Sequence, residues 1–147
     1  MTKPARNPSK TAHSTPYNSD HTDTALLHLE GAEGLLLMIG CTLENQDGQL
    51  LKNSQYAAAA DTIRALLEWS VDELAQDSQG HTDTIQLLQG TGAALYAFAC
   101  MHNDECSRSN NGYQMAALYS LQMVVSECSS RVTNAQEQAT QHGGVAA

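Results

Sequence analysis

The sequence has few aromatic residues, few prolines and no long apolar run, and each scarcity excludes a class of structure. Aromatic residues make up 5% of the 147 positions, which argues against a β-sheet protein. The three prolines all lie within the first 16 residues, so no proline interrupts a helix in the remaining chain. No apolar run approaches the ~20 residues that cross a membrane. We therefore expect an α-helical chain that does not span or bind a membrane.

The charge is distributed unevenly along the chain. Lys3, Arg6 and Lys10 lie in the first ten residues, whereas no acidic residue precedes Asp20. From residue 17 onward 4 basic residues stand against 16 acidic ones, which gives 4 − 16 = −12. Such a body repels the phosphates of nucleic acid, so we expect no direct nucleic-acid binding. It suits another protein, one with a basic surface.

The composition divides the chain into an arm, a body and a tail. Residues 1–20 are polar, contain every proline and show no apolar period, so we expect a disordered basic arm. Residues 21–133 form one helical domain with hairpin repeats at 21–77 and 81–133, and residues 134–147 are expected to be a frayed tail. The N-terminus lacks the apolar segment of a signal peptide, and the four cysteines are interpreted as reduced thiols. These features predict a cytoplasmic protein.

The body contains an internal repeat whose matches keep their order along the chain. They lie 60, 59, 59 and 57 residues apart, and an ordered series of this kind indicates a duplication. The matched segments are HTDT at 21 and 81, LEG at 29 with LQG at 88, Cys41 with Cys100, and Tyr56 with Tyr113. Glycine costs a helix about 1 kcal/mol against alanine. Because Gly31 and Gly90 match within helical patterns, we expect a neighbouring helix to approach the backbone there.

Apolar spacing predicts helices over residues 24–44, 51–75, 83–102 and 113–132. Both HTDT segments supply N-cap residues, and the polar stretches between the helices predict turns. The expected inward stripes are Ala25, Leu29, Ala32, Leu36, Ile39 and Leu43; Tyr56, Ala60, Ile63, Leu67 and Leu74; Leu88, Leu95 and Phe98; and Ala117, Leu121, Val124 and Cys128. Two tandem antiparallel hairpins of this kind close most simply into an all-α four-helix bundle. A paired homodimer would bury the same stripes.

Two segments carry a resemblance to known proteins. They are A-L-x-x-L-E-G-A-x-x-L-L from Ala25 and Y-A-A-A-A-D-T-I-R-A-L-L from Tyr56. Together they resemble a class of short uncharacterised bacterial proteins that consist of one helical hairpin with a Tyr/Ala-rich second helix. The resemblance implies a helical-hairpin fold, here duplicated, and it implies no activity.

Cysteine and histidine residues offer one candidate for a metal or thiol-redox site. Cys100, His102 and Cys106 form a Cys-x-His-x-x-x-Cys cluster, and zinc prefers these ligands. In a hairpin that turns near residue 107, Cys128 lies well down the bundle from Cys100, so the four ligands do not easily meet. Cys41 and Cys100 occupy matching places and are a candidate redox pair. We predict no metal and no cofactor, and a Cys/His metal or thiol-redox protein remains the third alternative.

The chain carries no catalytic signature. It lacks a G-x-S-x-G elbow, a phosphate-binding G-x-x-x-x-G-K-[ST] loop and a G-x-G-x-x-G turn after a strand. A di-iron bundle would need Glu-x-x-His pairs, whereas Glu30-x-x-Glu33 has no histidine partner. We therefore predict no catalytic residues and a protein that is not an enzyme.

What remains is an acidic helical surface with one tryptophan. A tryptophan rimmed by carboxylates is a typical hot spot for binding another protein. The predicted interaction residues are Glu30, Glu33, Glu68, Trp69, Asp72 and Glu73. The leading hypothesis is a non-enzymatic protein-binding module, a small regulator or inhibitor of bacterial or phage type. The alternative is an acidic mimic of nucleic acid that inhibits a DNA- or RNA-handling complex.

Overall fold

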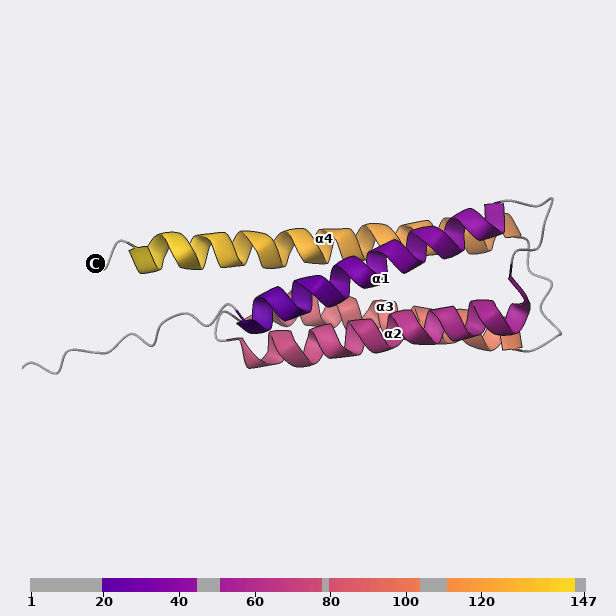
Figure 1. The fold of residues 1–147 in the computed structure, drawn as a ribbon, viewed down its shortest axis with the longest axis horizontal. Helices are drawn as coiled ribbons and strands as arrows, with labels where there is room; N and C mark the ends of the chain where they lie inside the picture. Colours follow the sequence, from indigo (N-terminus) through magenta and orange to yellow (C-terminus); the bar gives the residue numbers. More distant parts are fainter. Residues whose placement is uncertain (1–19, 45–50, 78–79, 104–110, 145–147) are drawn as a thin grey trace, which may run out of the picture.

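The computed structural model describes residues 20–44, 51–77, 80–103 and 111–144. Within these residues the chain forms four α-helices, namely α1 (Asp20–Glu44), α2 (Asn53–Gln76), α3 (Thr82–Asn103) and α4 (Asn111–Gly144) (Figure 1). The all-α class predicted from the sequence is confirmed.

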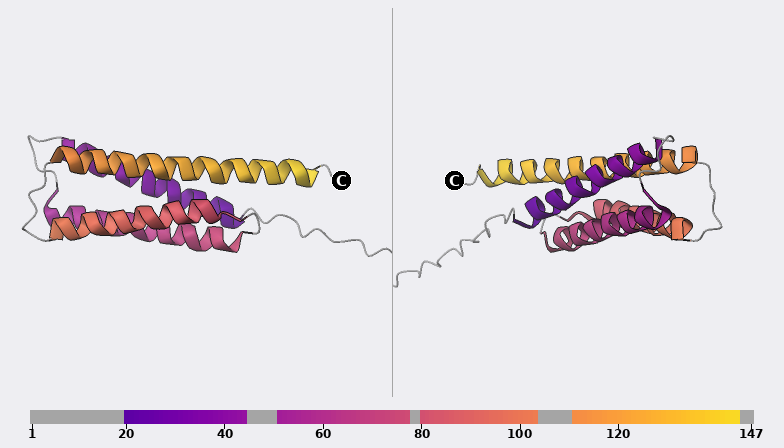
Figure 2. Two further views of the ribbon diagram at one scale, coloured as in Figure 1. Left: turned by 180° about the vertical axis from the view of Figure 1, so that it is seen from behind. Right: turned by 45° about the vertical axis from the view of Figure 1, so that its right-hand side comes forward.

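The four helices form a bundle in which each helix contacts the two that flank it. The contacts join α1 to α2, α2 to α3, α3 to α4 and α4 back to α1, and in the described part of the chain the backbones of the diagonal pairs do not approach closely. The contact between α3 and α4 is the least extensive of the four. Figures 1 and 2 show that α1 crosses the bundle obliquely and that the C-terminal turns of α4 project beyond the other helices. The predicted four-helix bundle of two hairpins is therefore confirmed.

The core follows the inward stripes predicted for the first three helices. Every stripe residue of α1, α2 and α3 is buried, with at most 6% of its surface exposed. Spacings of three and four residues place these side chains on one side of each helix, where they interdigitate along the bundle axis. Leu29, Leu36, Ile63, Leu88 and Leu95 are fully buried at its centre.

The stripe predicted for α4 is wrong. Ala117 is exposed, and Leu121 and Val124 are only half-buried. Of the predicted residues only Cys128 lies fully in the core, where it is joined by Leu118, Val125 and Val132.

The buried positions also correct the alignment of the two repeats. All eight buried residues of α1, Thr22 through Leu43, reappear as buried residues 59 positions later, from His81 to His102. The seven buried residues of α2 reappear 58 positions later as five buried and two half-buried residues of α4. Thr22 therefore corresponds to His81, so the two identical HTDT segments are out of structural register by one residue.

Three boundary predictions change with the structure. Asp20 is already the first residue of α1, so the arm predicted for residues 1–20 is one residue too long; residues 1–19 lie outside the described residues. HTDT at 21 lies inside the first turn of α1, where the Thr24 hydroxyl donates to the Asp20 carbonyl. The last helix continues to Gly144, so residues 134–144 are helical rather than frayed.

The close approach predicted at Gly31 and Gly90 is also wrong. A Cβ atom added at Gly90 would meet nothing within 4 Å, and one at Gly31 would make ordinary contact with Leu66 at 3.6 Å. The tight position is Gly40, where an added Cβ would lie 3.0 Å from Cε1 of Tyr119 on α4. A side chain at Gly40 would therefore need the Tyr119 ring to shift by a few tenths of an ångström, on the side of α1 that packs against α4.

Candidate functional site

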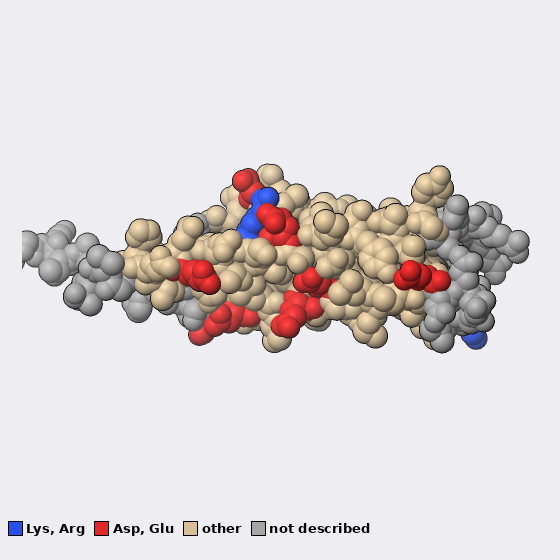
Figure 3. Space-filling view, turned by 90° about the horizontal axis from the view of Figure 1, so that it is seen from above, with Lys and Arg blue, Asp and Glu red and all other residues tan. Residues whose placement is uncertain are grey.

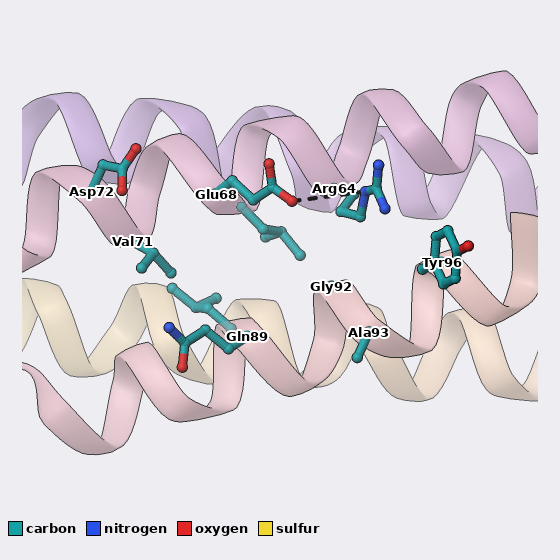
Figure 4. Close-up of a pocket in the computed structure, with 10 residues that line it drawn as sticks. Arg64, Glu68, Val71, Asp72, Gln89, Gly92, Ala93 and Tyr96 are labelled. Carbon is teal, nitrogen blue, oxygen red and sulfur yellow. Dashed lines mark ion pairs between the residues drawn. The ribbon is translucent and has the colours of Figure 1, made fainter.

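A groove of about 570 Å³ lies between α2 and α3 (Figure 4). Leu67, Val71 and Leu88 form its apolar floor. The remaining lining residues are Arg64, Glu68 and Asp72 of α2 and Gln89, Gly92, Ala93 and Tyr96 of α3. The groove therefore combines an apolar floor with a charged rim, which is the usual composition of a binding site.

The charged rim is organised around Arg64. Its guanidinium lies 5.3 Å above the ring centroid of Tyr96 on α3 and pairs with Asp61 (3.6 Å) and Glu68 (3.8 Å) on its own helix. A hydrogen bond with the Cys100 thiol and the charge of that thiol raise the pKa of Tyr96. Asp72 follows Glu68 by one helical turn, so one end of the rim is cationic and the other is acidic.

The groove is open because residue 92 has no side chain. In the repeat alignment Gly92 corresponds to Glu33, and Arg64 corresponds to Gln122. Between α1 and α4 the Glu33 carboxylate accepts a hydrogen bond of 2.7 Å from the Gln122 amide, which bridges that interface. Between α2 and α3 Gly92 offers no side chain to Arg64, whose Cγ would lie 3.7 Å from an added Cβ, and the Arg64 guanidinium extends instead to the ring of Tyr96. The two interfaces therefore differ: Glu33 and Gln122 are hydrogen-bonded in the first, whereas the second has a groove beside Gly92.

The six interaction residues predicted from the sequence do not form one surface. Glu68 and Asp72 line the groove, whereas Trp69 and Glu73 are directed toward α1, where they contact His28 (ring centroids 5.6 Å apart) and His21 (2.5 Å). Glu33 binds Gln122 on α4, and Glu30 is exposed on α1. On the face shown in Figure 3 the acidic residues also stand in separate groups, one of which adjoins a basic residue.

Three groove residues were missed by sequence reasoning, namely Arg64, Gly92 and Tyr96. Arg64 and Gly92 belong to no recognised motif, and Tyr96 lies outside the inward stripe predicted for its helix. The only signal for the groove is the difference between Glu33 and Gly92 at matched positions. That signal becomes readable only when the two copies are aligned by burial.

The candidate thiols do not gather at one place. Cys41 is exposed and hydrogen-bonds Tyr119 of α4, whereas Cys100 is half-buried and hydrogen-bonds Tyr96 of its own helix. Cys128 is buried, and Cys106 lies outside the described residues. Among the residues that the structure describes, no group of three His, Cys, Asp or Glu side chains is arranged to hold a metal ion.

A separate polar cluster lies where α1 begins, α2 ends and α3 begins. His81 Nε2 is 2.6 Å from Asp77 Oδ2, and the Thr22 hydroxyl donates to the same oxygen at 3.5 Å. Nearby, His21 contacts Glu73. The two HTDT histidines are thus held by Glu73 of α2 and by Asp77, the residue that follows α2, and the cluster ties three helices together.

Comparisons with known proteins give no match for this chain, whether with protein-family models, curated proteins or solved structures. The function is therefore argued from the groove.

Proposed function

We propose that the protein is a non-enzymatic binding module that holds an amphipathic helix of another protein in the groove between α2 and α3. The observation that carries this proposal is the groove itself, with an apolar floor and two carboxylates one turn apart on its rim. An amphipathic helix buries its apolar side chains in a groove of this kind. The floor of Leu67, Val71 and Leu88 would receive those side chains.

The charge of the groove favours a basic partner helix. Arg64 is engaged by Tyr96, Asp61 and Glu68, so Glu68 would be shared between Arg64 and a ligand. Asp72 is the rim carboxylate that faces a ligand most directly at the acidic end. A Lys or Arg of the partner would lie between Glu68 and Asp72. The −12 charge of the body would speed the approach of such a partner.

A binding module of this size would act as a small regulator or inhibitor of bacterial or phage type in the cytoplasm. We prefer it to an acidic mimic of nucleic acid. A duplex presents phosphates at close and even spacing. The carboxylates in Figure 3 stand in separate groups, and Glu33 and Glu73 already bind Gln122 and His21.

Site-specific photo-cross-linking tests the proposal in the expressing cell. A benzophenone amino acid at Ala93, which is exposed in the groove, should capture a partner protein that can be identified by mass spectrometry. The matched control carries the same group at Ala117, an exposed alanine on α4. Equal capture of the same protein at both positions would contradict the proposal, and so would the absence of any groove-specific product.

Charge variants then test the partner chemistry with the purified proteins. Glu68→Gln combined with Asp72→Asn should weaken binding about tenfold, corresponding to ~1.4 kcal/mol. It should also flatten the dependence of affinity on salt. Glu137→Gln removes an exposed carboxylate of α4 and should leave both quantities unchanged. Equal effects of the two changes would show that only the overall charge matters.

A further inference from the structure

Helix α1 carries a second apolar stripe that faces away from the bundle. We define this outer stripe as Leu27, Gly31, Gly34, Met38 and Cys41, all of which are exposed. The spacing is four, three, four and three residues, the same as in the buried stripe, so the five residues share one side of the helix. Leu27 and Met38 are 66% and 65% exposed. Leu27 and Met38 lie about three turns apart, with the two glycines between them, and together they make this side of α1 a candidate interaction surface.

The glycines of the outer stripe have no explanation inside the chain. An added Cβ at Gly34 would meet nothing within 4 Å, and neither Gly31 nor Gly34 has a positive φ. Alanine would therefore fit at Gly34 and would favour the helix. A glycine in such a position lets another backbone approach closely. The stripe thus offers two large side chains on either side of a shallow depression.

The second copy of the repeat does not carry this surface. In the alignment of the two hairpins, Gln86 and Ala97 of α3 stand where α1 has Leu27 and Met38. Gly90 still corresponds to Gly31. The outer stripe is therefore particular to α1 rather than a general property of the repeat.

Charge and side-chain size together decide between the candidate occupants of the outer stripe. Of the described helices, α1 is long and apolar enough to cross a membrane, although its inner stripe is part of the bundle core. A helix that lies on a lipid surface usually carries Lys and Arg. Helix α1 has five Asp and Glu and no basic residue. The five residues of the outer stripe are uncharged, although the exposed carboxylates of Asp23 and Glu30 lie along one edge of it. The order of large and small side chains about Gly34 is self-complementary, which favours a second copy of this chain as the occupant.

We propose that the outer stripe is the interface of a symmetric homodimer in which two α1 helices pack antiparallel. A two-fold axis beside Gly34 places Met38 of each copy over Gly31 of the other and brings Leu27 of each copy close to Cys41 of the other. Large side chains then fill the space that small ones leave, as an isologous interface requires. The groove between α2 and α3 lies on other helices and stays open in this dimer.

Sedimentation analysis of the full chain over a wide concentration range tests the proposal. The wild type should show a reversible monomer–dimer equilibrium. Met38→Glu should raise the dissociation constant at least about tenfold. Met123→Glu is the matched control, because Met123 is 70% exposed on α4, and it should leave the equilibrium unchanged. Circular dichroism should show that both variants keep their helices.

A glycine pair separates the dimer from ordinary helix stability. Gly34→Ala and Gly90→Ala each add a methyl group in open space and should both raise resistance to urea at concentrations where the chain is monomeric. Only Gly34→Ala should weaken the dimer. A wild type that is monomeric at all concentrations, or a dimer that tolerates Met38→Glu, would overturn the proposal. So would binding to vesicles of phosphatidylcholine and phosphatidylglycerol that Met38→Glu abolishes, since lipid would then be the occupant.

Discussion

The imidazole of His81 lies 2.6 Å from the carboxylate of Asp77, and the two side chains are only 5% and 2% exposed. The same carboxylate oxygen accepts the hydroxyl of Thr22 at the beginning of α1. One buried carboxylate thus holds the start of α1 and the residue before α3 against the end of α2. Truncating one partner of a buried polar pair leaves the other without its hydrogen bond.

Asp77→Ala should therefore lower the free energy of unfolding by about 2–3 kcal/mol. The measurement is urea unfolding followed by circular dichroism. Glu127→Ala is the control, because Glu127 and Arg131 form a pair with the same four-residue spacing but are 58% and 45% exposed. Its cost should stay below about 0.5 kcal/mol. Equal costs for the two variants would mean that Asp77 is not a buried anchor.

His102 should make the protein less stable in mild acid. Its ring packs between Tyr56 and Phe98, at centroid distances of 5.2 and 4.4 Å. Burial lowers the pKa of His102 below 6.5, although the neighbouring Gln114 side chain acts in the opposite direction. Above the unfolded pKa of about 6.5 neither state is protonated and there is no cost. As the pH falls below that value, the unfolded chain takes up the proton first and stability is lost until the lower folded pKa is reached.

The variant His102→Leu tests this pH dependence. Leucine is the residue at the matching position of the first hairpin, where Leu43 is buried. Between about pH 7.5 and pH 5 the wild type should lose more unfolding free energy than His102→Leu does, because only the wild type has this buried imidazole. Comparing the two proteins cancels the contributions of the other histidines. Identical losses would contradict the role assigned to His102.

The described cysteines should differ strongly in their reactivity toward iodoacetamide. Cys41 is exposed, whereas Cys128 is fully buried and its pKa is raised by burial. Alkylation requires an accessible thiolate. Peptide mass spectrometry should therefore show fast labelling of Cys41 and labelling of Cys128 only after unfolding in urea. Because Cys41 lies on the outer stripe of α1, its labelling should slow at concentrations where the proposed dimer forms.

Tyr56 and Tyr113 give a direct test of the repeat alignment. They match in the sequence, yet Tyr56 is 6% exposed and Tyr113 is 77% exposed. Tyr56→Ala should cost about 3 kcal/mol of unfolding free energy, as expected for a large side chain in the core. Tyr113→Ala should change it by less than about 0.5 kcal/mol. If urea unfolding showed similar losses for both variants, Tyr56 and Tyr113 would be equivalent positions and the offset between the two repeats would be 57 residues.

The accuracy of each predicted buried stripe depended on how many residues of that helix were apolar or small enough to be buried. In α1 the polar and small residues before the apolar run Leu35–Ile39 leave Ala25, Leu29 and Ala32 on the buried side, and the same spacing continues through Leu36 and Ile39. In α4 the segment from Ala116 to Val125 is apolar or small on nearly every side. Several rotations of the helix about its axis then place apolar residues on the buried side at every turn. The sequence alone therefore allows either Ala117 or Leu118 in the core. Only packing against α1 and α3 selects Leu118.

The site was predicted in part for a related reason. Glu68 and Asp72 follow from one helix face, because they lie one turn apart in the sequence. The groove needs a second helix, and it exists because Gly92 lacks the side chain that Glu33 provides in the other hairpin. The missing side chain at Gly92 leaves no pattern among its sequence neighbours, so it could not be recognised as part of a groove from the sequence alone.

The sequence by itself determined the helical class, the two hairpins and the buried sides of three helices, because these depend on residues a few positions apart. The tertiary structure decided the phase of α4, the registers of 59 and 58 residues between the repeats, and the separation of six acidic and aromatic candidates onto different faces. It also decided that Glu33 and Gln122 bridge one interface, whereas the corresponding interface has a groove lined by Gly92 and Arg64. Each of these depends on which residues, far apart in the chain, share one place in the packed bundle.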